Sequence, residues 1–226
     1  MFIGHYAVAL AAKKAAPRTS LGTLFMAAQF VDLLWPLLLL ADLEHVRPIG
    51  SASPFLRLEF TDYPISHSLA GAVLWSGVLG GLYRLIRRET RGALVVAACV
   101  FSHWILDFLT HRPDLPLWFS GGPYAGLGLW NSVWGTGVVE GGLFVAGAIV
   151  YLKTTRKKDG IGAWALWSLL LVLAAIYSGE FFGPPPPDVR TIGIVGNASW
   201  LFVLWAYWAD AHRTTLEGPA SAPKGA

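Results

Sequence analysis

The amino-acid sequence contains six apolar stretches, and their length limits the folds open to the chain. They cover Leu21–Ala41, Ile65–Ile86, Gly92–Thr110, Ser132–Leu152, Ile161–Phe181 and Thr191–Ala209. A helix of about 20 apolar residues spans the roughly 30 Å hydrocarbon layer of a bilayer. We therefore predict an all-α, polytopic transmembrane helix bundle with about six spans. Residues 1–212 are expected to form a single integral membrane domain, and residues 213–226 a disordered cytoplasmic tail.

Basic residues gather on one side of the predicted membrane. Under strict alternation of the spans, one side receives Lys13, Lys14, Arg18, Arg84, Arg87, Arg88, Arg91, Lys153, Arg156, Lys157, Lys158, Arg213 and Lys224. The opposite side receives only Arg47, Arg57, Arg112 and Arg190. Because basic loops resist translocation, both termini are expected in the cytoplasm. The formal net charge of +3 is then a topology signal and gives no support to nucleic-acid binding.

The first apolar segment, Met1–Ala12, is too short to cross a bilayer. It has no basic residues before it, so a signal peptide is not expected, and Lys13 follows it at the predicted cytoplasmic surface. We predict that it enters the membrane as a half-helix and carries His5 to a depth of roughly 12 Å. Lipid cannot satisfy the free amide groups at a helix start, so this half-helix needs protein neighbours.

Several ionisable residues lie inside the apolar stretches, where an uncompensated charge costs several kcal/mol. Counting from the basic side places Asp32, His103 and Glu140 at roughly the middle of the bilayer. Asp107 follows His103 by four residues and therefore projects from the same helix face. His67 opens the second stretch within about one turn of Asp107 in depth. The sequence therefore predicts that side chains from separate helices meet at one level.

Together these side chains have the composition of a metal site. A lone intramembrane histidine is more often a hydrogen-bond partner, so the interpretation depends on the joint pattern. A mixed nitrogen and oxygen set suits a divalent ion such as zinc or manganese. The single Cys99 excludes an internal disulfide and a cysteine zinc cluster. The predicted metal ligands are His5, Asp32, His67, His103 and Asp107.

Two further residues are candidates for moving a proton at this site. Glu140 has no Lys or Arg at its depth, so a nearby cation or a proton must compensate it. His111 continues the row of His103 and Asp107 at the outer boundary. We predict a catalytic role for Glu140 or His111, and a phosphate-attracting role for Arg112. Glu180 is expected to be a solvated surface charge.

The order and context of these residues resemble a known family. The chain shows Gly4-His5, then Asp32 within Phe30-Val31-Asp32-Leu33-Leu34-Trp35-Pro36, then Ser66-His67-Ser68, then Ser102-His103-Trp104-Ile105-Leu106-Asp107-Phe108-Leu109-Thr110. It resembles the predicted metal-dependent hydrolases of the bacterial inner membrane, which are distantly similar to zinc-dependent phospholipases C. The resemblance covers about the first half of the chain and is most specific at His103-x-x-x-Asp107.

The chain departs from this family pattern in two places. The family usually has two acids in a Pro-Asp-x-Asp-His block and a Thr before its His-Ser pair, whereas this chain has Asp32 alone and Ser66. Fewer carboxylates could mean one metal ion where relatives hold two or three, or no hydrolytic activity at all.

Three functions remain open from the sequence. The resemblance and the embedded site favour a metal-dependent hydrolase that cleaves a phosphoester or related bond of a lipid-like substrate. The alternatives are a proton or divalent-cation transporter that uses the same residues, and a non-catalytic membrane scaffold or metal-binding protein. The oligomeric state and the identity of the substrate do not follow from the sequence.

Overall fold

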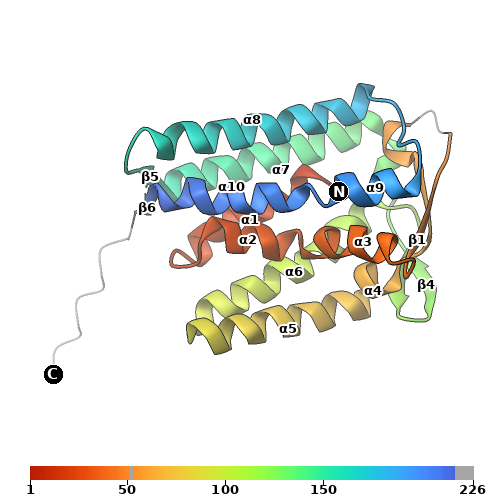
Figure 1. The fold of residues 1–226 in the computed structure, drawn as a ribbon, viewed down its shortest axis with the longest axis horizontal. Helices are drawn as coiled ribbons and strands as arrows, with labels where there is room; N and C mark the ends of the chain where they lie inside the picture. The colour runs from red at the N-terminus through yellow and green to blue at the C-terminus, as the bar shows by residue number, and fades with distance from the viewer. Residues whose placement is uncertain (51–52, 217–226) are drawn as a thin grey trace.

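The computed structural model describes residues 1–50 and 53–216 of the chain. Its helices run side by side along the long axis of the molecule, and short strands close both ends (Figure 1). The helices are α1 (Ile3–Ala15), α2 (Leu21–Ala28), α3 (Phe30–Leu40), α4 (Pro64–His67), α5 (Leu69–Arg87), α6 (Thr90–Thr110), α7 (Val133–Thr154), α8 (Ile161–Phe182), α9 (Val189–Gly196) and α10 (Ser199–Ala211). The strands are β1 (His45–Pro48), β2 (Leu58–Asp62), β3 (Leu115–Trp118), β4 (Gly121–Ala125), β5 (Thr155–Lys157) and β6 (Arg213–Thr215).

The long helices confirm the predicted transmembrane bundle. Helices α5, α6, α7 and α8, and the continuous segment made by α9 and α10, are each long and apolar enough to cross a membrane. Helices α2 and α3 complete a sixth candidate span, bent by 56° at Gln29. The chain is therefore an integral membrane protein with an all-α architecture, and the apolar side chains that remain exposed on α5, α7 and α8 suit contact with lipid.

Helix α1 lies inside the bundle, as the predicted half-helix requires. It packs against α7, α2 and α6, and its side chains His5, Tyr6 and Leu10 are fully buried. The approach to α7 is close because Gly147 has no side chain: a Cβ atom there would lie 2.4 Å from the Ala7 carbonyl oxygen. The first amide groups of α1 are thus surrounded by protein, whereas lipid could not satisfy their hydrogen bonds.

One end of the bundle, called the basic end below, holds the C-terminus of α1 and the two-stranded sheet of β5 and β6 (Figure 1). Strand β6 pairs antiparallel with β5, and the Arg213 guanidinium donates to the Gly162 carbonyl oxygen at 2.6 Å. The prediction of a disordered tail from residue 213 is therefore wrong for Arg213–Thr215, because backbone pairing and this arginine hold them. Residues 217–226 lie outside the described residues.

The opposite end, called the hairpin end, carries two antiparallel hairpins. Strand β1 pairs with β2, and β3 pairs with β4. The segment from Asp42 to Pro64 is long enough for an interfacial helix, but its described part forms the first hairpin and a 3₁₀ turn at Pro54–Leu56. Pro48 disfavours a continuous helix here, since proline inside a helix removes a hydrogen bond and clashes with the preceding turn.

Candidate metal centre

The five predicted metal ligands meet in the structure, although they come from four different helices. His5 lies on α1, Asp32 on α3, His67 on α4, and His103 and Asp107 on α6. The three histidines and Asp107 are buried, and Asp32 is partly exposed toward a cavity. Buried ionisable groups of this number require mutual compensation or a bound ion.

The distances between the ligand atoms define two overlapping groups. His5, His103 and Asp107 offer one ligand atom each within 4.8 Å of one another, and so do Asp32, His67 and His103. His103 Nε2 lies 3.1 Å from Asp107 Oδ2 and 3.6 Å from Asp32 Oδ1. His67 Nε2 lies 3.4 Å from Asp32 Oδ1 and 3.9 Å from Asp107 Oδ2. His5 Nε2 lies 3.2 Å from Asp107 Oδ1.

These spacings are close to those of donor atoms around a small metal ion. Zinc binds imidazole nitrogen and carboxylate oxygen at roughly 2.0–2.2 Å in tetrahedral geometry, which separates neighbouring donors by about 3.4 Å. The five separations between donors from different residues run from 3.1 to 3.9 Å. Within each of the two groups, the ligand atoms therefore lie close enough together to share a small divalent cation.

The hydrogen bonds of two histidines leave Nε2 free to bind an ion. His103 Nδ1 lies 2.8 Å from the Ala28 carbonyl oxygen, which can only accept, so Nδ1 carries a proton, and in the neutral imidazole the lone pair is on Nε2. His103 Nε2 is buried and has no hydrogen-bond partner among the described residues. His67 Nδ1 contacts the Ser66 hydroxyl at 2.6 Å, and its Nε2 faces the two aspartates. Such anchoring of the remote nitrogen is usual for metal-binding histidines.

His5 completes the cluster from the α1 side. Its ring stacks on the His103 ring, with centroids 3.6 Å apart and planes at 5°. The Met1 amino nitrogen, just before α1, lies 2.7 Å from Asp107 Oδ1. The position of His5 thus depends on how α1 docks in the bundle.

Glu140 lies close to the cluster and binds the start of α1. Its Oε2 atom accepts the Phe2 amide at 2.8 Å and the Gly4 amide at 3.5 Å, and its side chain is buried. The amide groups at the start of α1 therefore help to stabilise the negative charge of the Glu140 carboxylate, which has no Lys or Arg at its depth.

His111 lies at the hairpin end of α6 beside an acid that the sequence did not single out. His111 Nδ1 contacts Asp114 Oδ1 at 3.0 Å, and the imidazole lies against the Trp130 ring with centroids 4.3 Å apart. Burial lowers the pKa of His111, and the hydrogen bond to the Asp114 carboxylate opposes this shift. His111 and Asp114 thus form a pair in which the acid orients the imidazole.

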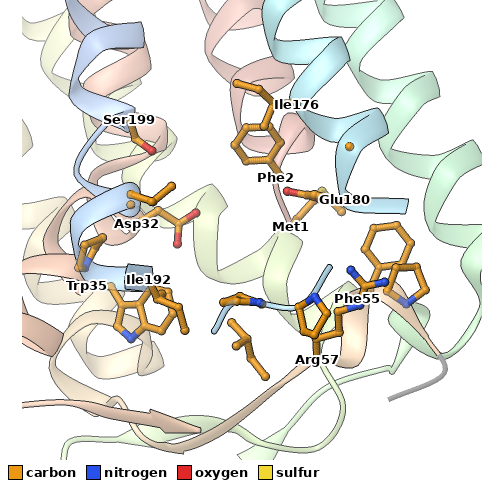
Figure 2. Close-up of a pocket in the computed structure, with 18 of the residues that line it drawn as sticks. Met1, Phe2, Asp32, Trp35, Phe55, Arg57, Ile176, Glu180, Ile192 and Ser199 are labelled. Atoms are coloured by element: carbon orange, nitrogen blue, oxygen red, sulfur yellow. The ribbon is translucent and has the colours of Figure 1, made fainter. Parts of the chain in front are cut away.

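A cavity of about 710 Å³ joins these groups to the hairpin end. Asp32 and Glu180 lie on different walls, each directing its carboxylate into the space between them (Figure 2). Asp107, His67, His111 and Glu140 also line it, so all the predicted catalytic residues and three of the predicted ligands face one space. Much of the remaining lining is apolar and includes Trp35, Pro36, Phe55, Ile176, Ile192 and Phe202.

Two sequence expectations about this region need correction. Glu180 is not a solvated surface charge but a partly buried residue that lines the cavity, because it shares a face of α8 with the lining residue Ile176 four positions earlier. Arg112 is absent from the cavity lining, and its Nε lies 3.8 Å from Asp114 Oδ2. Arg57 lines the cavity instead and donates to the Gly183 carbonyl oxygen at 2.5 Å.

Glu44 and Asp114 are the polar contacts that sequence reasoning missed. Both lie in loops, where no helical spacing indicates which neighbours they will meet. Glu44 is buried and binds Ser66, the residue before His67. Burial raises the pKa of Glu44, and His67 and the Ser66 hydrogen bonds oppose that shift. For Asp114 the available signal was its spacing of three residues after His111.

Comparison with known proteins returned no match for the chain among family models, curated proteins or solved structures. The geometry of the site is therefore the main evidence for the function of the chain.

Proposed function

We propose that the protein is a membrane-embedded, metal-dependent hydrolase that cleaves a phosphoester or related bond of a lipid-like substrate. The observation that carries the proposal is the cluster of three histidines and two aspartates at the wall of a largely apolar cavity. The resemblance to predicted hydrolases of the bacterial inner membrane agrees with this reading. The basic end, which collects most of the Lys and Arg residues and holds the end of α10, is proposed to face the cytoplasm, whereas the Met1 amino group lies inside the bundle beside Asp107.

The cluster is proposed to hold one divalent ion, zinc or manganese. Both groups of ligands depend on His103. Its Nδ1 atom is occupied by the Ala28 carbonyl oxygen, so only one lone pair, on Nε2, is left for a metal. Two ions could not both take this atom, and either group without His103 would keep only two ligands. The chain is therefore expected to bind one ion.

A divalent ion bound there would polarise a phosphoryl oxygen and bring the pKa of a water ligand toward neutrality. His111 is the proposed proton carrier, since it faces the cavity and Asp114 orients its ring. Glu140, the other predicted candidate, already accepts two amides of the α1 start. Its proposed role is to hold α1, and with it His5, in place.

The cavity lining supports a substrate with apolar portions. Aromatic, proline and aliphatic side chains form much of the wall, and an acyl or isoprenoid chain would bury its apolar surface against them. Arg57 supplies a guanidinium that is suited to an anionic ester group. The scissile group would then lie between Arg57 and the metal ligands.

Transport of a proton or cation is less well supported, because the described part of the bundle is packed between the site and the basic end. Leu10 on α1, Leu24 on α2 and Ala206 on α10 are fully buried there. Lys13 Nζ further joins α1 to Asp210 on α10 at 2.8 Å. Alternating access opens a site to one side of the membrane at a time, so transport would require this packed region to open in a second conformation.

The test uses detergent-purified full-length protein, zinc or manganese, and a fluorogenic lipid phosphodiester in mixed micelles. We expect turnover that stops with a chelator and falls to background in the double variant His103→Ala, Asp107→Ala. His45→Ala is the matched control, because this histidine lies in β1, half exposed and outside the cluster. Turnover that persists in the double variant would refute the assignment. Metal binding without turnover of any phosphoester or related lipid would favour the non-catalytic alternative.

A further inference from the structure

A chain of three hydrogen-bonded side chains leads from a loop to the proposed metal ligand His67. Glu44 follows α3 and is 1% exposed. Its Oε1 atom accepts the Ser66 amide at 2.8 Å, and its Oε2 atom accepts the Ser66 hydroxyl at 2.5 Å. The Ser66 oxygen lies 2.6 Å from His67 Nδ1. The chain therefore ends on the ring nitrogen that faces away from the cluster.

The donors and acceptors along this chain can be arranged in only one direction when Glu44 is ionised. A carboxylate only accepts, and the Ser66 hydroxyl has a single proton, which it gives to Glu44. The Ser66 oxygen can then only accept from His67, so the imidazole proton must sit on Nδ1. The lone pair of His67 is thereby fixed on Nε2, the atom that faces Asp32 and Asp107.

We propose that Glu44 is a positioning residue that acts through Ser66 to fix the metal-binding tautomer of His67. The inference rests on the proposed metal site and adds to it a buried acid outside the ligand set. Histidine ligands commonly have such a partner on the remote nitrogen, and its loss weakens metal binding by about 10- to 100-fold.

A simpler role for Glu44 would be to cap the start of α4 by accepting the Ser66 amide. The variant Glu44→Gln separates the two roles. The Ser66 amide requires the glutamine oxygen in the Oε1 position, which places the glutamine NH₂ group against the Ser66 hydroxyl. The hydroxyl then accepts from glutamine, and its own proton is free to point to His67 Nδ1, which allows the imidazole proton to move to Nε2. The cap is kept, but the metal-binding tautomer is no longer fixed.

The experiment titrates cobalt(II) into the detergent-purified full chain at pH 8 and follows its visible absorption, which reports on the ligands of the ion. We expect Glu44→Gln to bind cobalt about 10- to 100-fold more weakly, with altered absorption bands. Glu59→Gln, a change on strand β2 at the surface, should bind like the unmodified protein. In a Ser66→Ala background the link is already broken, so Glu44→Gln should cause no further loss.

The two proposals fail in different ways. If the unmodified protein binds no cobalt, the metal site itself is refuted. If it binds cobalt and Glu44→Gln binds it with the same affinity and the same absorption, the metal site stands and the role of Glu44 is refuted. Should Glu44→Gln not fold, Ser66→Ala and Ser66→Thr replace it. The threonine keeps the hydroxyl and should retain affinity, whereas equal binding by the alanine variant would contradict the inference.

Discussion

The close contact between α1 and α7 gives the most direct test of how the site is built. A Cβ atom added at Gly147 would lie 2.4 Å from the Ala7 carbonyl oxygen and 2.8 Å from the Ala7 Cα atom. Both are backbone atoms of α1, so no flexible side chain can move aside. Gly147→Ala must therefore push α1 away from α7, and His5, two residues before Ala7, moves with it.

Two opposing effects set the expected magnitude. Replacing glycine by alanine in a helix gains about 1 kcal/mol in helix propensity. Forcing an extra methyl group into a packed interface costs about 1–3 kcal/mol. Gly141 on the same helix has open space around its Cβ position, so Gly141→Ala should show the gain alone. We expect Gly147→Ala to be less stable than Gly141→Ala by about 1–3 kcal/mol.

The assay is reversible unfolding in mixed micelles with increasing dodecyl sulfate, followed by circular dichroism, together with zinc affinity. Gly147→Ala should unfold at lower dodecyl sulfate than Gly141→Ala and bind zinc more weakly, because α1 carries His5. Equal stability and equal zinc affinity of the two variants would show that α1 is not seated against α7 as described.

Three other changes test single contacts. His111→Asn should lower turnover by about 100- to 10,000-fold while zinc content stays at the level of the unmodified protein, and a parallel loss of zinc would contradict its role as proton carrier. Glu140→Ala should lower the free energy of unfolding by about 1–3 kcal/mol, since two amides of α1 lose their acceptor. Unchanged stability would argue against these two hydrogen bonds. Asp210→Asn should destabilise the protein by about 3–5 kcal/mol, because it leaves Lys13 buried without its charge partner. Adding Lys13→Met should recover part of that loss. Strictly additive losses of stability would contradict the pairing.

Much of the bundle follows from the sequence, since apolar length alone locates the spans. Counting along helices also places His103 and Asp107 on one face and Asp32 at their depth, and the structure brings all three together. The half-helix before Lys13 was predictable because a short apolar segment that carries a histidine needs protein around it.

Loop contacts could not be predicted in this way. Glu44 reaches Ser66 because the segment after α3 folds into a hairpin, and no periodic pattern marks that path. The bend at Gln29 was equally hidden, although the Ala28 carbonyl oxygen beside it fixes the orientation of His103. These contacts depend on how distant segments pack, which spacing along one helix does not describe.

The central claim is that one divalent ion sits among His5, Asp32, His67, His103 and Asp107. Elemental analysis of the detergent-purified protein, joined with X-ray absorption at the metal edge, tests it most directly. The account predicts one zinc or manganese ion per chain with nitrogen and oxygen ligands at roughly 2.0–2.2 Å, lost in His103→Ala, Asp107→Ala. Metal-free protein after reconstitution with either ion, or a metal content that the double variant leaves unchanged, would contradict it.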